Sequence, residues 1–302
     1  MRYSRAAAKP FSLRKCSRAK SLLTNPFVSL QASKATPLRL AARYSVGSIN
    51  ITDMDRLGLI GKPSDWLIAS TYNVEAVRTR LNCELVEIDI REVTSLGEVE
   101  DGETGALRIY RRLREIVDTY RLTGLTLRCF DLLTTVRNTG CLALAKLNAE
   151  GIPAACEGDV PALLTMVLAH RLTGCSGFQC NPARVNTATG EMLWAHCTIP
   201  LNMAERYEYE THFESGIGIS LHADLPLGDY TLVKVNGDLT RIFAEDVLLT
   251  RNQHQPNLCR TQVWLKTRHV IPYLLSDPIA NHHILVPGHH AREFENIFQR
   301  IR

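Results

Sequence analysis

The sequence predicts an α/β fold class, with a parallel α/β domain at 55–180 followed by a mainly antiparallel β domain at 185–302. In the first region, apolar runs of strand length alternate with longer runs of helical spacing, the rhythm of a parallel α/β domain. In the second region, short apolar runs follow one another and are separated by turn sequences such as Asn236-Gly237-Asp238, as in antiparallel sheets. Residues 1–50 show neither pattern.

The elements of the first region follow from local periodicity and helix-end signals. The stripe that includes Leu113, Ile116 and Val117 recurs at helical spacing, so it predicts a helix with a buried face. Asp159 precedes a proline-led apolar run and is a favoured N-cap residue, so a helix is expected to begin after it. The expected strands cover 57–60, 84–90, 125–130 and 152–156, and the expected helices cover 74–81, 107–120, 141–148 and 160–171.

The second region is expected to consist of strands and one closing helix. The stretch 177–190 is polar and rich in threonine and asparagine, which predicts a loop before the first of these strands. The expected strands cover 192–198, 216–222, 230–236, 239–245, 261–265 and 282–286, and the closing helix covers 291–301.

Composition excludes several classes of protein. The chain of 302 residues is 22% charged and 45% apolar, which is typical of a globular protein with room for a large core. No run approaches the roughly 18 apolar residues of a membrane span, so no membrane association is expected. The nine cysteines are odd in number and lack a CxxC motif, which favours buried free thiols in a reducing compartment over disulfides or a cysteine zinc site.

Charge is distributed unevenly along the chain. Residues 1–50 carry ten Lys or Arg and no acidic residue, which leaves 25 basic and 31 acidic residues in the remainder. The mildly acidic remainder predicts no nucleic-acid surface. The basic segment is expected to be disordered, either as a mitochondrial or plastid transit peptide or as an artefactual extension. Without a functional transit peptide, the expected location is the cytoplasm.

Five motifs in order resemble the L-fucose isomerase family, most closely its shorter, divergent members. The resemblance begins near residue 56 and runs to the end of the chain. It implies the family's fold, a homo-oligomer, and a metal-dependent aldose–ketose isomerase acting on a sugar such as L-fucose or D-arabinose with Mn²⁺ or Mg²⁺. The motifs are RCFDLL at 128–133, CEGDVPALLTM at 156–166, HCTIP at 196–200, HFESGIG at 212–218 and ANHHILVPGHHA at 280–291.

Isomerisation through an ene-diol needs a divalent cation on two neighbouring sugar oxygens and a base that moves a proton between C1 and C2. The resemblance places Asp159 as a metal-binding carboxylate with a catalytic role, and Glu157 as a further ligand or base. Both residues follow an expected strand, at the edge where α/β sheets bind ligands. The spacing alone also allows Asp159 to act only as a helix cap.

Histidines supply the remaining candidates for the metal and the reaction. The motif at 280–291 resembles the family's C-terminal histidine motif, and His283 is the expected ligand. Adjacent strand residues point to opposite faces, so His282 is expected to contact substrate, although a half-buried histidine pair would fit the pattern too. His196 ends an apolar run and is a catalytic or supporting candidate, or a hydrogen-bonded core histidine.

The remaining candidates are weaker. Glu214 and Arg260 are expected to contact substrate, although Arg260 could instead pair with an acidic side chain. Leu142 stands where the family carries a second acidic residue, and leucine can neither bind metal nor accept a proton. Either Glu157 or Asp131 takes that role, or the chemistry differs. Two function classes therefore stand, an isomerase and a catalytically weakened sugar-binding or assembly protein.

Overall fold

The first part of the fold is a parallel sheet. The computed structural model describes residues 54–301, so the basic segment expected at 1–50 lies outside the described residues. Among the described residues, the strands lie side by side in the order β2-β1-β3-β4, and every neighbouring pair is parallel. These are β1 (Asp55–Ile60), β2 (Cys83–Ile88), β3 (Gly124–Leu127) and β4 (Ala154–Cys156), the strands that the sequence predicted.

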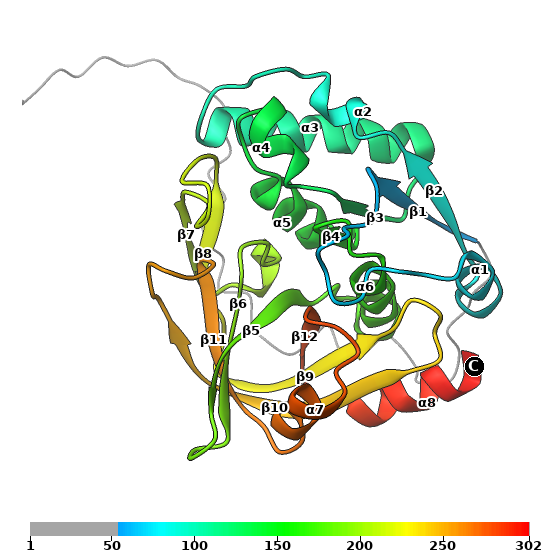
Figure 1. Ribbon diagram of the computed structural model, residues 1–302, viewed down its shortest axis with the longest axis vertical. Coiled ribbons are helices and arrows are strands. Elements are labelled where there is room, and N and C mark those ends of the chain that lie inside the picture. The colour runs from blue at the N-terminus through cyan, green and yellow to red at the C-terminus, as the bar shows by residue number, and fades with distance from the viewer. Residues whose placement is uncertain (1–53, 302) are drawn as a thin grey trace, which may run out of the picture. The chain divides into compact units, whose positions relative to one another are not determined.

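Helices connect and cover these strands (Figure 1). The long helix α3 begins at Glu103, four residues before the predicted start, and buries the predicted stripe. Two one-turn helices, α2 and α4, were not predicted because they are too short to show a period. The helices of this part are α1 (Val74–Leu81), α2 (Arg91–Thr94), α3 (Glu103–Tyr120), α4 (Asp131–Thr135), α5 (Cys141–Ala149) and α6 (Val160–Thr173).

Helix α6 is buried on all sides. Its first ten residues, Val160 to Ala169, are all buried, which is expected only for a helix enclosed by protein. Asp159 caps its N-terminus and Gly174 its C-terminus, the glycine in the left-handed conformation with φ 74°. One apolar cluster contains residues of α6 together with residues of β1, β9 (Gly228–Val235) and β12 (His283–Pro287), so the parallel sheet and the β-rich part share this cluster.

The β-rich part is a closed antiparallel barrel with the strand order β10-β11-β6-β5-β12-β9 among the described residues. A separate antiparallel pair, β7 and β8, lies beside it. The predicted fold class, a parallel α/β region followed by a mainly antiparallel region, is confirmed. The barrel strands are β5 (Phe178–Asn186), β6 (Glu191–His196), β9 (Gly228–Val235), β10 (Ile242–Gln253), β11 (Thr261–Lys266) and β12 (His283–Pro287).

The other elements are short or peripheral. Helix α8 buries Phe294 and Phe298, in agreement with the predicted closing helix. No helix of residues 54–301 is long and apolar enough to cross a membrane. These elements are β7 (Arg206–Glu210), β8 (Ser220–Asp224), the 3-10 helix Leu201–Met203, α7 (Val270–Ser276) and α8 (Ala291–Ile301).

Three predictions in the β-rich region were wrong, and one of them is the strand predicted at 216–222, which begins at Ser220. The stretch predicted as a loop at 177–190 contains strand β5, whose polar residues hid its period because only its first three residues are buried. A register shift between Pro182 and Arg184 accommodates the proline, as at a β-bulge. The strand predicted at 239–245 begins at Ile242 and extends to Gln253, because Leu239 lies in a turn with φ 57°.

Candidate active site and metal centre

The site begins at the turn that joins β4 to α6. Glu157 and Gly158 both adopt the left-handed conformation, with φ 63° and 62°. A Cβ atom at position 158 would lie 2.8 Å from the carbonyl oxygen of Lys62, so only glycine fits there. The Ser64 hydroxyl donates to the Glu157 carbonyl oxygen. A non-glycine residue held in this conformation is uncommon and is often found at functional sites.

The Asp159 carboxylate is completely buried and surrounded by protein donors. Its Oδ1 accepts from the Ala162 amide at 2.7 Å, so the helix-capping role is confirmed. Lys234 Nζ lies 3.4 Å from each carboxylate oxygen, and His282 Nδ1 lies 2.9 Å from Oδ2. The oxygens that the family resemblance assigned to a metal ion are therefore occupied by an ammonium, an imidazole and a backbone amide.

Lys234 was not recognised in the sequence. It lies on β9 with its side chain fully buried, opposite a fully buried Asp159. Burial lowers the pKa of Lys234, and the Asp159 charge opposes that effect. A lysine inside the apolar run Leu232 to Val235 was the available signal, because lysine is almost never buried unless it is paired.

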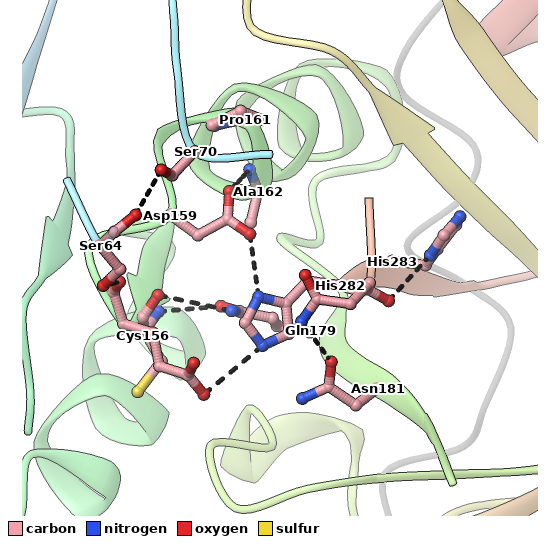
Figure 2. Close-up of polar contacts among 12 residues, drawn as sticks. Ser64, Ser70, Cys156, Asp159, Pro161, Ala162, Gln179, Asn181, His282 and His283 are labelled. Atoms are coloured by element: carbon pink, nitrogen blue, oxygen red, sulfur yellow. Dashed lines mark hydrogen bonds and ion pairs between the residues drawn. The ribbon is translucent and has the colours of Figure 1, made fainter. Parts of the chain in front are cut away.

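The two neighbouring histidines point to opposite faces of the chain, as predicted. The ring of His282 lies against Asp159, with Nε2 at 3.5 Å from Glu157 Oε1. His283 turns away from the carboxylates (Figure 2), and its Nε2 lies 3.1 Å from the Tyr273 hydroxyl. The expectation that His283 lies with the carboxylates is corrected. His283 pairs with Cys180 of the neighbouring strand β5, and this register directs His282 toward the carboxylates instead.

His196 completes the arrangement from the end of β6. Its Nε2 lies 3.4 Å from Glu157 Oε1, and its ring centroid lies 5.3 Å from that of His282. Thr198 Oγ1 lies 3.0 Å from His196 Nδ1. In both histidines, therefore, a protein group holds Nδ1 while Nε2 faces Glu157.

Electrostatics differ among the three groups. Burial opposes ionisation of Glu157, but its contacts with His196 and His282 hold the pKa of this carboxyl well below its usual range. Burial also opposes a charge on His282, yet Asp159 and Glu157 raise its pKa to about 9. The pKa of His196 is lowered because burial dominates. Without a bound ion, a carboxylate, a charged imidazole and a neutral imidazole therefore meet at neutral pH, and a metal ion would have to displace the Nε2 proton of His282.

These three side chains fit a divalent cation. Donor atoms of Glu157, His196 and His282 all lie within 4.8 Å of one another. His282 Nε2 is buried without a hydrogen-bond partner among the described residues, since its 3.5 Å approach to Glu157 exceeds a normal hydrogen bond. Two imidazoles and a carboxylate suit divalent transition metals. Asp159 and Thr198 would orient the rings, as partners of metal-binding histidines do.

Glu214 and Arg260 are less closely connected to this group. Glu214 is exposed, and burial together with the Glu157 charge raises its pKa. Arg260 donates from Nε to the Thr211 carbonyl at 2.8 Å and lies 3.3 Å from Glu210 Oε2. The alternative that Arg260 pairs with an acidic residue is therefore confirmed.

The position of the family's second acid and the alternative acid Asp131 both lie apart from the two histidines. Leu142 is fully buried in an apolar cluster. Asp131 instead pairs with Arg128, whose Nε lies 3.3 Å from Asp131 Oδ1. Of the acids considered for proton transfer, Glu157 is the one that the structure brings to the two histidines.

An aromatic wall beside Glu157 was also missed in the sequence. Trp66 Nε1 lies 3.5 Å from Glu157 Oε2, and the indole remains 46% exposed. Phe130 packs edge-on between Trp66 and His212, with ring centroids 5.6 and 6.1 Å away. The wall offers an exposed aromatic surface next to the carboxylate, and its members come from segments too far apart for a sequence pattern to connect them.

Comparison with known proteins gives weak but consistent similarity to sugar isomerases. The sulfoquinovose isomerase of Clostridium sp. (strain MSTE9) is 27% identical over 124 residues, covering 40% of this chain and 26% of the relative. That of Alkalicoccus urumqiensis is 22% identical over 232 residues, covering 69% of this chain and 52% of the relative. No family model matches the chain.

The chain thus matches between a quarter and about half of the length of these relatives. Both relatives carry the name of an isomerase that acts on a sugar, which agrees with the reaction class implied by the L-fucose isomerase resemblance. The similarity is shared by two sulfoquinovose isomerases from different organisms. It does not distinguish the exact family.

Proposed function

We propose that the chain catalyses aldose–ketose isomerisation of a sugar at a divalent metal centre held by Glu157, His196 and His282. The observation that carries the proposal is the convergence of these side chains around a buried, unpartnered imidazole nitrogen. The similarity to sulfoquinovose isomerases supports the same reaction class. This metal set replaces the set Asp159, His283 and Glu157 expected from the resemblance.

Each residue has a distinct role in this proposal. Bound Mn²⁺ or Mg²⁺ would stabilise the negative charge that develops on neighbouring sugar oxygens. Glu157 directs Oε1 to the histidines and Oε2 to Trp66, so Oε2 is the atom that moves the proton between C1 and C2. Asp159 orients His282 through Nδ1, and the paired Lys234 keeps Asp159 ionised by lowering its pKa against the effect of burial.

The substrate proposed is an aldose of the sulfoquinovose type, with L-fucose and D-arabinose as the alternatives from the family resemblance. Trp66 and Phe130 would contact the apolar face of the sugar, since aromatic rings present a large apolar surface with a polar tip on Trp. Glu214, exposed and within electrostatic reach of Glu157, would contact a sugar hydroxyl.

The test is a ketose-formation assay on the full chain with sulfoquinovose, L-fucose and D-arabinose. The protein is stripped of metal with a chelator and then supplied with Mn²⁺ or Mg²⁺. Activity is expected to return with metal, and Glu157→Gln is expected to reduce kcat by at least a hundredfold, the lower range for loss of a general base. His283→Gln, on the opposite face, is the matched control and should retain most activity.

A sugar-binding protein without turnover is the second candidate. Two observations favour it. Buried Leu142 stands in place of an acid, and the Asp159 carboxylate is paired with the Lys234 ammonium. Calorimetric titration with the same sugars separates the two functions. Binding without ketose formation, in the presence of either metal, would support this second function and refute the first.

We also propose a homo-oligomer, as the resemblance implies. Light scattering on the full chain should then give a multiple of the 33.8 kDa chain mass. A stable mass of one chain at micromolar concentration would contradict it.

A further inference from the structure

Cysteines that are far apart in the sequence gather next to the candidate active site. Cys129 and Cys156 have their sulfur atoms 3.0 Å apart, and those of Cys141 and Cys197 are 3.3 Å apart. The Cys259 thiol lies near enough to Cys197 for each to shift the pKa of the other. Cys156 directly precedes Glu157, and Cys197 directly follows His196. The cluster is therefore continuous with the backbone that holds the proposed metal ligands, but its own side chains have no role in the proposed function.

His212 lies next to two of these cysteines. Donor atoms of Cys141, Cys197 and His212 all lie within 4.8 Å of one another, and all three residues are buried. His212 Nδ1 lies 3.0 Å from the Ser215 hydroxyl, which leaves Nε2 for the thiols. A ring held through one nitrogen, with the other left to bind the metal, is the usual arrangement of a metal-binding histidine.

We propose that Cys141, Cys197 and His212 bind a Zn²⁺ ion distinct from the Glu157 centre, and that Cys259, which lies outside this group of three, moves in as the fourth ligand. Sulfur and imidazole donors are the preferred ligands of zinc, and Cys₃His is a common closed tetrahedral set. On binding, the three thiols become thiolates and release their protons to solvent. Oxygen-preferring ions such as Mg²⁺ do not suit these donors, so Mg²⁺ is not expected to bind at this second site.

The position of the four ligands indicates a structural role. Cys141 is the first residue of α5, Cys197 follows β6, His212 follows β7, and Cys259 precedes β11. The ion would therefore tie a helix of the parallel α/β part to three segments of the β-rich part. Cys197 directly follows His196 in the chain. The same ion would therefore also fix the end of β6, where His196 is a proposed ligand of the Glu157 centre.

The test uses the full chain expressed in zinc-supplemented medium and purified without chelator. Metal analysis is expected to find one tightly bound zinc per chain. After replacement with Co²⁺, a strong thiolate-to-cobalt charge-transfer band is expected in the near ultraviolet. This band requires cysteine ligands, so it cannot arise from Glu157, His196 and His282. His282→Gln should retain it, which separates this proposal from the proposed function.

Cys141→Ser and Cys197→Ser should each lose the band and the zinc. Cys175→Ser, at a half-exposed cysteine outside the four proposed ligands, is the matched control and should retain both. If the two variants fail to fold, titration of wild-type thiols with an organic mercurial decides the matter, because it should release one equivalent of zinc. Absence of both zinc and the band overturns the proposal, and so does a Cys141–Cys197 disulfide found by peptide mass analysis of freshly purified, unreduced protein.

Discussion

At the scale of single residues, the site depends on which nitrogen of each histidine is held by the protein. Asp159 holds Nδ1 of His282 at 2.9 Å and Thr198 holds Nδ1 of His196 at 3.0 Å. Both Nε2 atoms then face Glu157. The neighbouring residue His283 bonds Tyr273 instead and cannot share this function.

The first prediction concerns this contrast between His282 and His283. Saturating Mn²⁺ should raise the unfolding midpoint of the wild type, since a ligand at a hundredfold excess over Kd adds about 2.7 kcal/mol. His282→Gln should abolish the Mn²⁺-dependent shift, whereas His283→Gln should preserve it. Thermal unfolding with and without Mn²⁺ measures both. Equal shifts in the wild type and His282→Gln would remove His282 from the metal centre.

The second prediction concerns the buried pair of Lys234 and Asp159. Both side chains are completely buried, so removing one charge leaves the other without compensation. Lys234→Met should cost about 3–5 kcal/mol of unfolding free energy, as for other broken buried pairs. The double variant Lys234→Met/Asp159→Asn should recover a large part of that loss, because asparagine still caps α6.

Denaturant unfolding of both single variants and the double variant gives the coupling energy. Additive losses in the double variant would show that the pair does not interact. A near-neutral Lys234→Met would show that the ammonium is not needed to balance Asp159.

At the scale of secondary-structure elements, helix α8 is anchored by a residue from another element. Asp246 on β10 accepts hydrogen bonds from the amides of His290 and Ala291, each at 3.0 Å, and from the Thr231 hydroxyl at 2.7 Å. It thereby acts as an N-cap for α8 in place of a residue of the helix itself. Burial opposes its charge, but these donors lower the pKa of Asp246 below 3.8.

The third prediction is that Asp246→Ala destabilises the protein by about 1 kcal/mol, the usual contribution of an N-cap. The folded pKa is depressed, so the contribution of the charge is complete above pH 3.8 and is lost as pH falls through the folded pKa. Asp246→Asn is the control, because it keeps an acceptor but cannot titrate. The difference between wild type and Asp246→Asn should therefore shrink on acidification below about pH 4, in denaturant unfolding across pH.

At the scale of the whole described chain, helix α6 joins the parallel sheet to the barrel. The buried residues of α6 share one apolar cluster with Val233, Val235 and Ile284 of the barrel strands. One apolar cluster therefore crosses the division between 55–180 and 185–302, while another lies wholly within the parallel part.

The fourth prediction is a single cooperative unfolding transition, because neither part can lose α6 and keep its core. Leu164→Ala, at a fully buried position of α6, should cost about 2–5 kcal/mol and lower the one midpoint without splitting it. Scanning calorimetry measures this through the ratio of calorimetric to van't Hoff enthalpy. Two resolved transitions, with only one moved by the substitution, would show two independent domains.

Local pattern determined the elements and the general location of the site. The apolar period of a strand or helix depends only on residues within one short segment. The same holds for the proline after Asp159 and the small residues before it. That is why the parallel strands, the cap of α6 and the opposite orientation of His282 and His283 were all predicted correctly. Strand β5 was missed because partial exposure on the barrel removes the apolar signal on which such predictions depend.

Tertiary structure alone decided which side chains meet. The register of β12 in the barrel determines that His282, not His283, reaches Asp159 and Glu157. The enclosure of β9 buries Lys234 against the same Asp159. The paired cysteines are far apart in the sequence: Cys129 and Cys156 are separated by 27 residues, and Cys141 and Cys197 by 56. Such contacts depend on the packing of distant segments, and nothing within either segment carries information about its partner.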